Sequence, residues 1–259
     1  MDIQKIRKTS FRKFFELDSN LESIINGHPH YAYLSNPPIS NIYQYLTDYT
    51  ALASEQLLGK NRADLSVLDW GTGKGNVTYL LKRFGFGNVV SCDIESSRDT
   101  FDENALIIKS LNLNIVPLRH ESNLPFDDNS FDVVVSYGVL EHVPNDLASL
   151  KEIKRILKPN GLFFCFHLPR KLGYVHRIAH MLGDRYHSRL YDRKYSRALL
   201  DKSGFQLLDI WERTILPKNR FNFKSANATM EKVDHALVNF TPLRLISTNI
   251  EFVAQKAGH

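Results

Sequence analysis

The chain has 259 residues, 43% of them hydrophobic and 24% charged, and its formal net charge is +5. This composition excludes a globally disordered chain and provides the core of one α/β domain with additions. No apolar run approaches the ~20 residues of a membrane span, and residues 1–5 lack the apolar segment of a signal peptide, so a cytoplasmic protein is expected. The positive charge permits an anionic partner, such as a phosphorylated acceptor, a nucleic acid or an acidic membrane surface.

The sequence predicts an N-terminal helical cap over residues 1–60 and a main domain over residues 61–259. An aromatic-rich helix at the end of the cap contains Tyr43, Tyr45 and Tyr49. Packing is the simpler interpretation of these tyrosines, and closure over a ligand is the alternative. Helical segments of the cap are broken at residues 27–30 and 36–38.

In the main domain, short β-rich runs alternate with helical ones, which predicts a parallel sheet covered on both faces. Two later β-rich runs lack this alternation and favour an antiparallel pair, so that the sheet holds seven strands. The expected strands are residues 65–69, 88–93, 114–118, 131–136, 161–167, 205–215 and 246–255.

A basic insertion at about residues 169–195 follows the carboxyl end of a predicted strand, where open α/β sheets bind ligands, and is expected to form a lid. Its His176 and His180 have the spacing of zinc ligands on a helix, but no glutamate stands between them and no cysteine pair is near, so a polar lid face is favoured. Cys92 and Cys165 lie in separate apolar runs and are expected to be buried thiols. No metal site is predicted.

A glycine-rich turn with Gly71, Gly73 and Gly75 lies between an apolar run and a helical run. Glycines let a ligand approach the backbone closely, and the start of the following helix offers free N–H groups to an anion. A nicotinamide-binding turn prefers a third glycine at position 76, where this chain has Asn76, so a dehydrogenase is disfavoured. A tight strand-to-helix connection explains a lone turn of this kind equally well.

Asp93 ends the next predicted strand, 22 residues after Gly71. A carboxylate in this position can accept hydrogen bonds from both ribose hydroxyls, although alone it is more simply a solvated strand-end residue. Together, the turn and Asp93 indicate a nucleoside-bearing cofactor.

Five ordered motifs make the chain resemble the class I S-adenosylmethionine-dependent methyltransferases, in the branch with a Leu-Pro-Phe run. The resemblance covers about residues 62–168 and implies a Rossmann-like αβα sandwich, a mixed seven-stranded sheet whose last strand is antiparallel, and S-adenosyl-L-methionine as the cofactor. The motifs are residues 68–75, 92–95, 124–132, 135–144 and 152–161.

Carried over residue by residue, the resemblance assigns cofactor contacts to these motifs. Asp93 would bind the ribose, Ile94 would pack against adenine, and Tyr137 would lie near the reacting methyl group. The family usually has an aspartate four residues before Leu124 for the adenine amino group, but this chain has His120 there, followed by Glu121, which can substitute for it. The methionine moiety would be held by Asp69 and by the backbone of Gly71, Gly73 and Gly75.

Methyl transfer is an in-line displacement, so the protein mainly aligns the reactants and excludes water. A hydroxyl or amine acceptor also needs a base, and histidine has the side-chain pKa closest to neutral. His142 is the first candidate, and His167, at the end of the fifth predicted strand, is the second. For His142 taken alone, a structural role at the start of a helix is slightly favoured over catalysis.

The sequence therefore predicts methyl transfer to a small-molecule, sugar or lipid-linked acceptor, at oxygen in preference to nitrogen or carbon. One rival is an RNA-modifying methyltransferase, although no appended RNA-binding module or basic-aromatic pattern is visible, which disfavours nucleic acid without excluding it. The other rival is a noncatalytic partner protein that keeps the fold. The oligomeric state is not indicated.

Overall fold

The computed structural model describes residues 2–102, 105–174, 189–214, 216 and 227–258. Most of the predicted lid, with His176 and His180, lies outside these residues. Among the helices of the described ranges, none combines the length and the apolar character that crossing a membrane requires.

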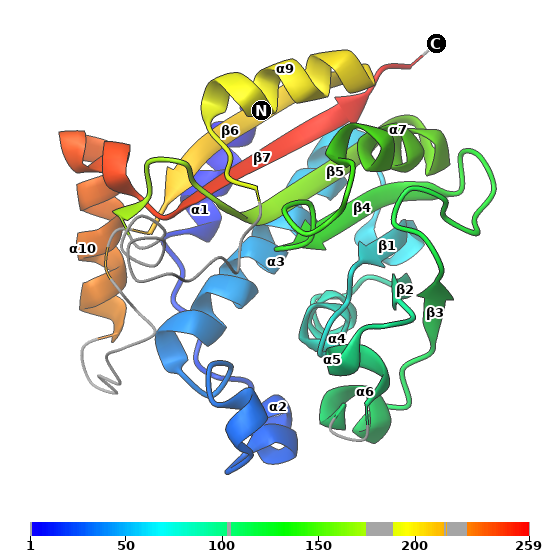
Figure 1. Cartoon of the computed structure of the whole chain (residues 1–259). Helices are drawn as coiled ribbons and strands as arrows, with labels where there is room; N and C mark the ends of the chain where they lie inside the picture. Colours follow the sequence, from blue (N-terminus) through cyan, green and yellow to red (C-terminus); the bar gives the residue numbers. More distant parts are fainter. Residues whose placement is uncertain (1, 103–104, 175–188, 215, 217–226, 259) are drawn as a thin grey trace.

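The described residues form one seven-stranded sheet in the order β3-β2-β1-β4-β5-β7-β6. All neighbouring strands are parallel except β7, which runs antiparallel to both β5 and β6, as predicted (Figure 1). The strands are β1 (Ser66–Trp70), β2 (Asn88–Ile94), β3 (Ile115–Leu118), β4 (Phe131–Tyr137), β5 (Leu157–Pro169), β6 (Phe205–Arg213) and β7 (Asn249–Lys256).

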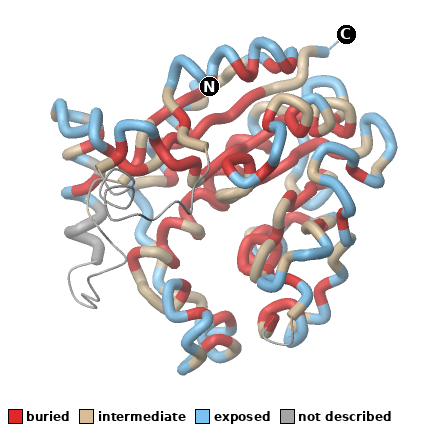
Figure 2. The backbone as a smooth tube through the Cα atoms, viewed as in Figure 1, coloured by how far each residue is buried: buried red, intermediate tan, exposed pale blue. Residues whose placement is uncertain are grey.

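Helices cover both faces of the sheet, which gives the αβα sandwich. One apolar core joins Leu68 and Val134 to α7 and α9, and a second core joins Val67 to α3 and α4. Because successive side chains of a strand point to opposite faces, the two cores share the same strands. Figure 2 shows the buried strands between partly exposed helices. The helices that build these layers are α3 (Pro37–Leu58), α4 (Asn76–Arg83), α7 (Asp146–Ile156) and α9 (Arg193–Ser203).

Shorter elements complete the fold before β1 and beside the sheet. The segment before β1 also packs on the second core, since Ile6 is part of it. The remaining elements are α1 (Ile3–Ser10), α2 (Ser19–Ile25), η1 (Pro29–Tyr31), η2 (Arg62–Asp64), α5 (Arg98–Phe101), α6 (Leu106–Ser110), α10 (Asn227–Phe240) and η4 (Pro242–Ile246).

The aromatic-rich helix of the cap is α3, and the predicted break at residues 36–38 is its beginning. Pro37 starts the helix, where its missing N–H costs nothing, and Gly59 ends it with a left-handed φ of +64°. Tyr45 and Tyr49 are buried in the second core, which confirms the packing interpretation for these two.

Several strand boundaries differ from the prediction. β5 begins at Leu157 rather than at residue 161, because Leu157 already pairs with Phe131 before the register shifts. β7 begins at Asn249 rather than at residue 246, because the preceding residues form η4. Cys92 and Cys165 are buried free thiols, as expected.

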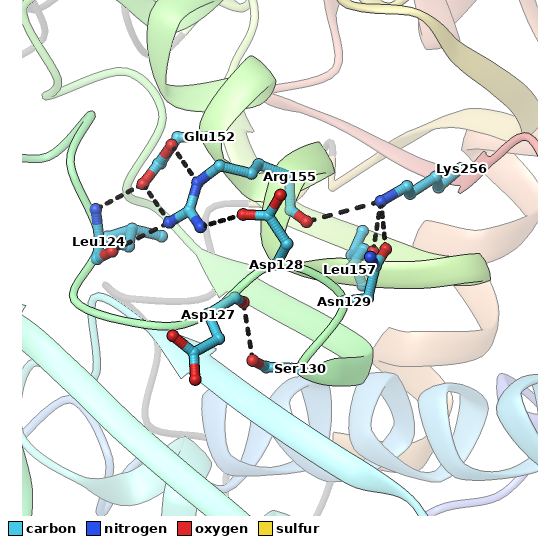
Figure 3. Close-up of polar contacts among 9 residues, drawn as sticks. All are labelled: Leu124, Asp127, Asp128, Asn129, Ser130, Glu152, Arg155, Leu157 and Lys256. Carbon is cyan, nitrogen blue, oxygen red and sulfur yellow. Dashed lines mark hydrogen bonds and ion pairs between the residues drawn. The ribbon is translucent and has the colours of Figure 1, made fainter.

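The Leu-Pro-Phe motif is anchored to α7 and β7 (Figure 3). Arg155 donates to the carbonyl oxygen of Leu124 (3.1 Å), to Asp128 (2.6 Å) and to Glu152 (2.8 Å). Lys256 donates to the side-chain oxygen of Asn129 at 2.8 Å. These contacts fix the loop that leads into β4, so the later part of the motif serves the fold rather than the cofactor.

Candidate functional site

A cavity of about 370 Å³ opens at the carboxyl ends of β1, β2 and β4. Its size suits a drug-sized or nucleoside-sized ligand, and its place is the one where open parallel sheets bind ligands. The wall combines residues of three of the five sequence motifs. Among its lining residues are Gly71, Gly73, Asp93, Glu121, Tyr137 and His142.

The glycine-rich turn is held against β2 and leaves room in front of its backbone. The amide of Gly71 donates to the carbonyl oxygen of Cys92 at 2.9 Å. A Cβ at Gly71 would lie 2.4 Å from a methyl carbon of Val139, so this position has no space for a side chain. At Gly73 (φ +52°), no heavy atom of the described residues would lie within 4 Å of an added Cβ. A cofactor can therefore approach the backbone of Gly73 directly.

Asp69 lies beneath the turn, and Gly75 lies behind it. The Asp69 carboxylate accepts hydrogen bonds from the hydroxyls of Thr72 (2.8 Å) and Thr78 (2.6 Å), and burial raises its pKa to about 6. A Cβ at Gly75 would meet Ile108 of α6 at 2.8 Å. Neither residue is among those that line the cavity. Their position suits shaping the turn rather than touching the methionine moiety.

Asp93 lines the cavity and ties β2 to the turn. One of its carboxylate oxygens accepts from the amide of Gly73 at 2.9 Å, and the other accepts from the amide of Ile94 at 2.8 Å. The Thr100 hydroxyl also donates to this carboxylate. An ionised carboxylate has about four acceptor positions, and three are occupied, so Asp93 retains one position for a ribose hydroxyl.

The structure separates the two residues that were considered for adenine recognition. Glu121 is half-buried and lines the cavity together with Ile94 and Leu118. His120 is exposed and lines a different hollow, next to Glu95. Of these two residues, only Glu121 lines the cavity.

The other end of the cavity is aromatic. Tyr137 stacks on Tyr43 of α3 with ring centroids 5.6 Å apart, and both line the cavity. The ring of His167 lies 4.9 Å from that of Tyr43, but His167 is not among the lining residues. Burial raises the pKa of Tyr43 to about 12. Of the two histidines, only His142 lines the cavity directly.

His142 has 41% of its side chain exposed, and partial burial lowers its pKa. The imidazole is therefore neutral at physiological pH and can accept a proton. Its Nε2 atom lies 3.9 Å from a carboxylate oxygen of Glu141, which is buried and whose pKa burial raises to about 8.

His167 has a left-handed backbone, with φ of +65°. Its amide donates to one carboxylate oxygen of Glu251 at 2.6 Å, and the other oxygen of Glu251 accepts from Arg213 at 2.6 Å. Burial lowers the pKa of His167 well below its usual value. Sequence patterns did not identify Glu251 and Arg213 as neighbours of the site, because they lie on β7 and β6 and belong to no recognisable motif.

The cap closes one side of the cavity through contacts that the sequence did not indicate. Lys74, within the glycine-rich motif, donates to the carbonyl oxygen of His30 at 2.6 Å, and its ammonium lies 4.7 Å from the ring centroid of Tyr33. His30 also pairs with Asp99 at 3.0 Å. Tyr33, Lys74 and Asp99 all line the cavity.

The loop that carries His142 is clamped from the segment before α9. Arg189 donates to the carbonyl oxygens of Val143 (2.9 Å) and Pro144 (3.0 Å). The hydroxyl of Tyr191 donates to the carbonyl oxygen of Leu140 at 2.9 Å. Within the ranges that the structure describes, no group of three or more His, Cys, Asp or Glu side chains is placed to hold a metal ion.

Comparison with known proteins agrees with this geometry. Residues 68–165 match the family model of a methyltransferase domain. A demethylmenaquinone methyltransferase from Staphylococcus epidermidis is 46% identical over 71 residues, which cover 25% of this chain and 29% of that protein's length. The sequence match thus spans less than a third of that relative.

Two solved structures share the fold. A protein from Galdieria sulphuraria described as a sarcosine dimethylglycine methyltransferase has a TM-score of 0.58 at 19% identity, covering 85% of this chain and 86% of its own. A phosphoethanolamine N-methyltransferase of Haemonchus contortus, solved with phosphomonomethylethanolamine and S-adenosylhomocysteine, has a TM-score of 0.54 at 17% identity, covering 81% of this chain and 52% of its own. Residues 68–165 thus match a methyltransferase domain, and the chain as a whole shares the fold of these methyltransferases.

Proposed function

We propose that this protein transfers the methyl group of S-adenosylmethionine to a small-molecule acceptor, at an oxygen atom. The observation that carries the proposal is one cavity wall that combines an open glycine backbone and three carboxylates with stacked tyrosines and a neutral histidine. The glycine backbone and the carboxylates suit the cofactor, and the tyrosines and the histidine suit the acceptor.

The residues present fit the cofactor. Gly73 leaves its backbone open to the methionine moiety, Asp93 can accept from a ribose hydroxyl, and Glu121 can accept from the adenine amino group. When bound, the cofactor supplies an electrophilic methyl group on a positively charged sulfur. The protein's part is to hold both reactants in line and to exclude water, which Tyr43 and Tyr137 do by covering the inner end of the cavity.

His142 is proposed as the general base. Because its pKa is lowered by burial, the imidazole is neutral and can take the proton that an acceptor hydroxyl loses as the new C–O bond forms. His167 lies behind Tyr43 and Tyr137, so the proposal gives it a secondary role, in which its ring supports the aromatic wall.

Small-molecule, sugar and lipid-linked acceptors all remain within the proposal. The relative with the matched 71 residues is named for demethylmenaquinone, a small-molecule acceptor, and this favours the same class here. The division into a cap of residues 1–60 and a main domain of residues 61–259, with a lid at about 169–195, belongs to the proposal as well. The contact of Lys74 with His30 supports a cap that covers the cofactor.

Calorimetric titration with S-adenosylmethionine and S-adenosylhomocysteine tests the site. We expect the wild type to bind both, Gly73→Val to lose binding because the side chain fills the cofactor space, and Glu121→Gln to bind at least several-fold more weakly. Glu95→Gln is the matched control, because Glu95 is exposed in the neighbouring hollow. Folded wild type that binds neither ligand would reject the proposal and favour the noncatalytic partner.

Acceptors are then screened with labelled cofactor, and the base is tested on the first acceptor found. His142→Gln should lower kcat by about two to four orders of magnitude and remove the acidic limb of the pH–rate profile. The cofactor affinity should stay within a few-fold of wild type. An unchanged pH profile in His142→Gln would assign the proton transfer to another group.

A further inference from the structure

Large apolar side chains are exposed together at one end of the molecule, over the end of α10, through η4 and at the turn that follows β5. The exposed fractions are 82% for Phe240, 54% for Leu245 and 49% for Leu172. Leu243 and Ile246 are also exposed. We call these five residues the α10–η4 patch. Figure 2 shows exposed chain at this end of the molecule.

The turn after β5 lies against the end of η4 and belongs to the same surface, although Arg170 and Ser247, which join the two segments, are 77 residues apart in the sequence. Arg170 is buried and donates to the side chain of Ser247 at 2.8 Å, and its amide donates to the carbonyl oxygen of Thr248 at 2.9 Å. Gly173 lies against the backbone of the same two residues. These contacts hold Leu172 beside η4.

The charged residues of the turn after β5 and of η4 have one sign. Lys171 lies in that turn and Arg244 lies in η4, and both are exposed. Residues 170–174 and 240–248 contain no aspartate or glutamate. Asp234 of α10 is buried and accepts a hydrogen bond from the amide of Leu216. The patch thus presents apolar and cationic groups without an exposed anion in these segments.

The patch lies at the same edge of the sheet as the cofactor cavity. Pro169, at the carboxyl end of β5, pairs with Asn249, at the beginning of β7, so η4 and the turn after β5 flank the carboxyl edge. The parallel strands β1 and β4 end at that edge with the cavity. Figure 1 shows α10 beside the ends of β5 and β6 and the beginning of β7.

We propose that the α10–η4 patch docks the protein onto the surface of a bilayer that contains anionic phospholipids. Exposed apolar side chains enter the region between headgroups and acyl chains, while Lys171 and Arg244 meet the lipid phosphates; this combination is the one that interfacial segments use. A patch that paired with a second copy of this chain would bring like charges together, which disfavours that occupant. Docking would bring the cavity edge to a lipid-borne acceptor.

Vesicle co-sedimentation of the full chain tests the proposal. We expect binding to vesicles of phosphatidylcholine mixed with phosphatidylglycerol, weaker binding to phosphatidylcholine alone, and a decrease with added salt. The double variant Phe240→Ser/Leu245→Ser should bind the mixed vesicles at least about tenfold more weakly. Arg244→Gln should bind more weakly than wild type and lose part of the salt dependence.

Phe101→Ser is the matched control, because Phe101 is 44% exposed on α5, away from the patch, and its loss should leave vesicle binding unchanged. Circular dichroism and S-adenosylhomocysteine titration show that the variants are folded. Wild type that fails to bind the mixed vesicles, or a double variant that binds them as well as wild type, overturns the proposal. Sedimentation velocity tests the alternative occupant. If the wild type does not bind vesicles but forms a dimer, and the double variant is a monomer, the patch is assigned to contact with a second copy of this chain.

The docking proposal does not depend on methyl transfer. The patch residues lie outside the cavity wall, so the double variant should keep the cofactor affinity of the wild type. Failure of vesicle binding with intact cofactor binding rejects docking alone, and failure of cofactor binding with intact vesicle binding rejects the proposed function alone.

Discussion

Arg189 donates a hydrogen bond to the carbonyl oxygen of Val143 at 2.9 Å, from a segment that lies 46 residues further along the chain. The bond fixes one side of the loop that carries His142 in the cavity wall. The same guanidinium reaches Pro144 and pairs with Asp146 at 3.5 Å. The shape of the site therefore depends on a residue that does not line it.

Arg189→Met should loosen this loop. Loss of hydrogen bonds to partly buried carbonyl groups should cost about 1 to 3 kcal/mol of the free energy of unfolding. Amide hydrogen exchange of residues 140–144 should accelerate, which mass spectrometry measures. Arg193→Met is the control, because Arg193 pairs with Glu212 and touches no carbonyl group of the loop. Equal exchange in the two variants would show that Arg189 does not hold the loop.

Gly71→Ala should abolish cofactor binding and destabilise the fold, because its Cβ would lie 2.4 Å from Val139 and its φ is +75°. Gly59→Ala measures the backbone strain alone, since φ is +64° there and no heavy atom of the described residues lies within 4 Å of the added Cβ. We expect Gly59→Ala to lower the free energy of unfolding by roughly 1 to 2 kcal/mol and Gly71→Ala to lower it by more. The added mutation Val139→Ala should recover part of the difference, as measured by urea denaturation.

Asp132 should contribute stability that is lost only in acid. Although burial alone would raise its pKa, hydrogen bonds from Lys158 (2.7 Å) and Lys60 (2.8 Å) hold it well below the usual value. Its contribution is therefore complete above the pKa of an unfolded aspartate, about 4, and disappears as the pH falls through the lower folded value.

Asp132→Asn should lower the free energy of unfolding by about 1 to 3 kcal/mol at pH 7, with a difference from wild type that shrinks below about pH 4. Urea denaturation across this pH range measures it. Asp128→Asn is the control, because Asp128 is 68% exposed in its pair with Arg155, and the expected change is below about 1 kcal/mol. A difference that stays constant into acid would contradict the assignment.

Glu141 should give the opposite pH dependence. Burial and, to a smaller extent, the neighbouring Glu251 raise its pKa to about 8. At a pH between the pKa of an unfolded glutamate, near 4, and the pKa in the folded protein, the native state holds a proton on Glu141 that the unfolded state has lost. The free energy of unfolding therefore falls as the pH rises through this range, by up to about 1.4 kcal/mol per pH unit. Glu141→Gln removes this dependence and should become relatively more stable toward pH 8, as denaturation midpoints can show. Parallel pH curves for the two proteins would contradict the raised pKa.

The sequence by itself determined the fold class and the place of the cofactor turn. Alternating apolar runs predict the strands of a parallel sheet, and Gly71 and Gly73 between a strand and a helix predict the tight turn with positive φ that the structure has. These signals are local, because side-chain alternation and positive φ are properties of a few adjacent residues. Asp93 was found in the same way, from its distance along the chain.

Only the tertiary structure decided which side chains face the cavity. His120 and Glu121 are adjacent, yet His120 is exposed in another hollow and Glu121 lines the site. Likewise, the amide of His167, whose φ is +65°, donates to Glu251, which lies 84 residues further along the chain. Contacts between distant segments form when the sheet assembles, and no local pattern in the chain encodes them.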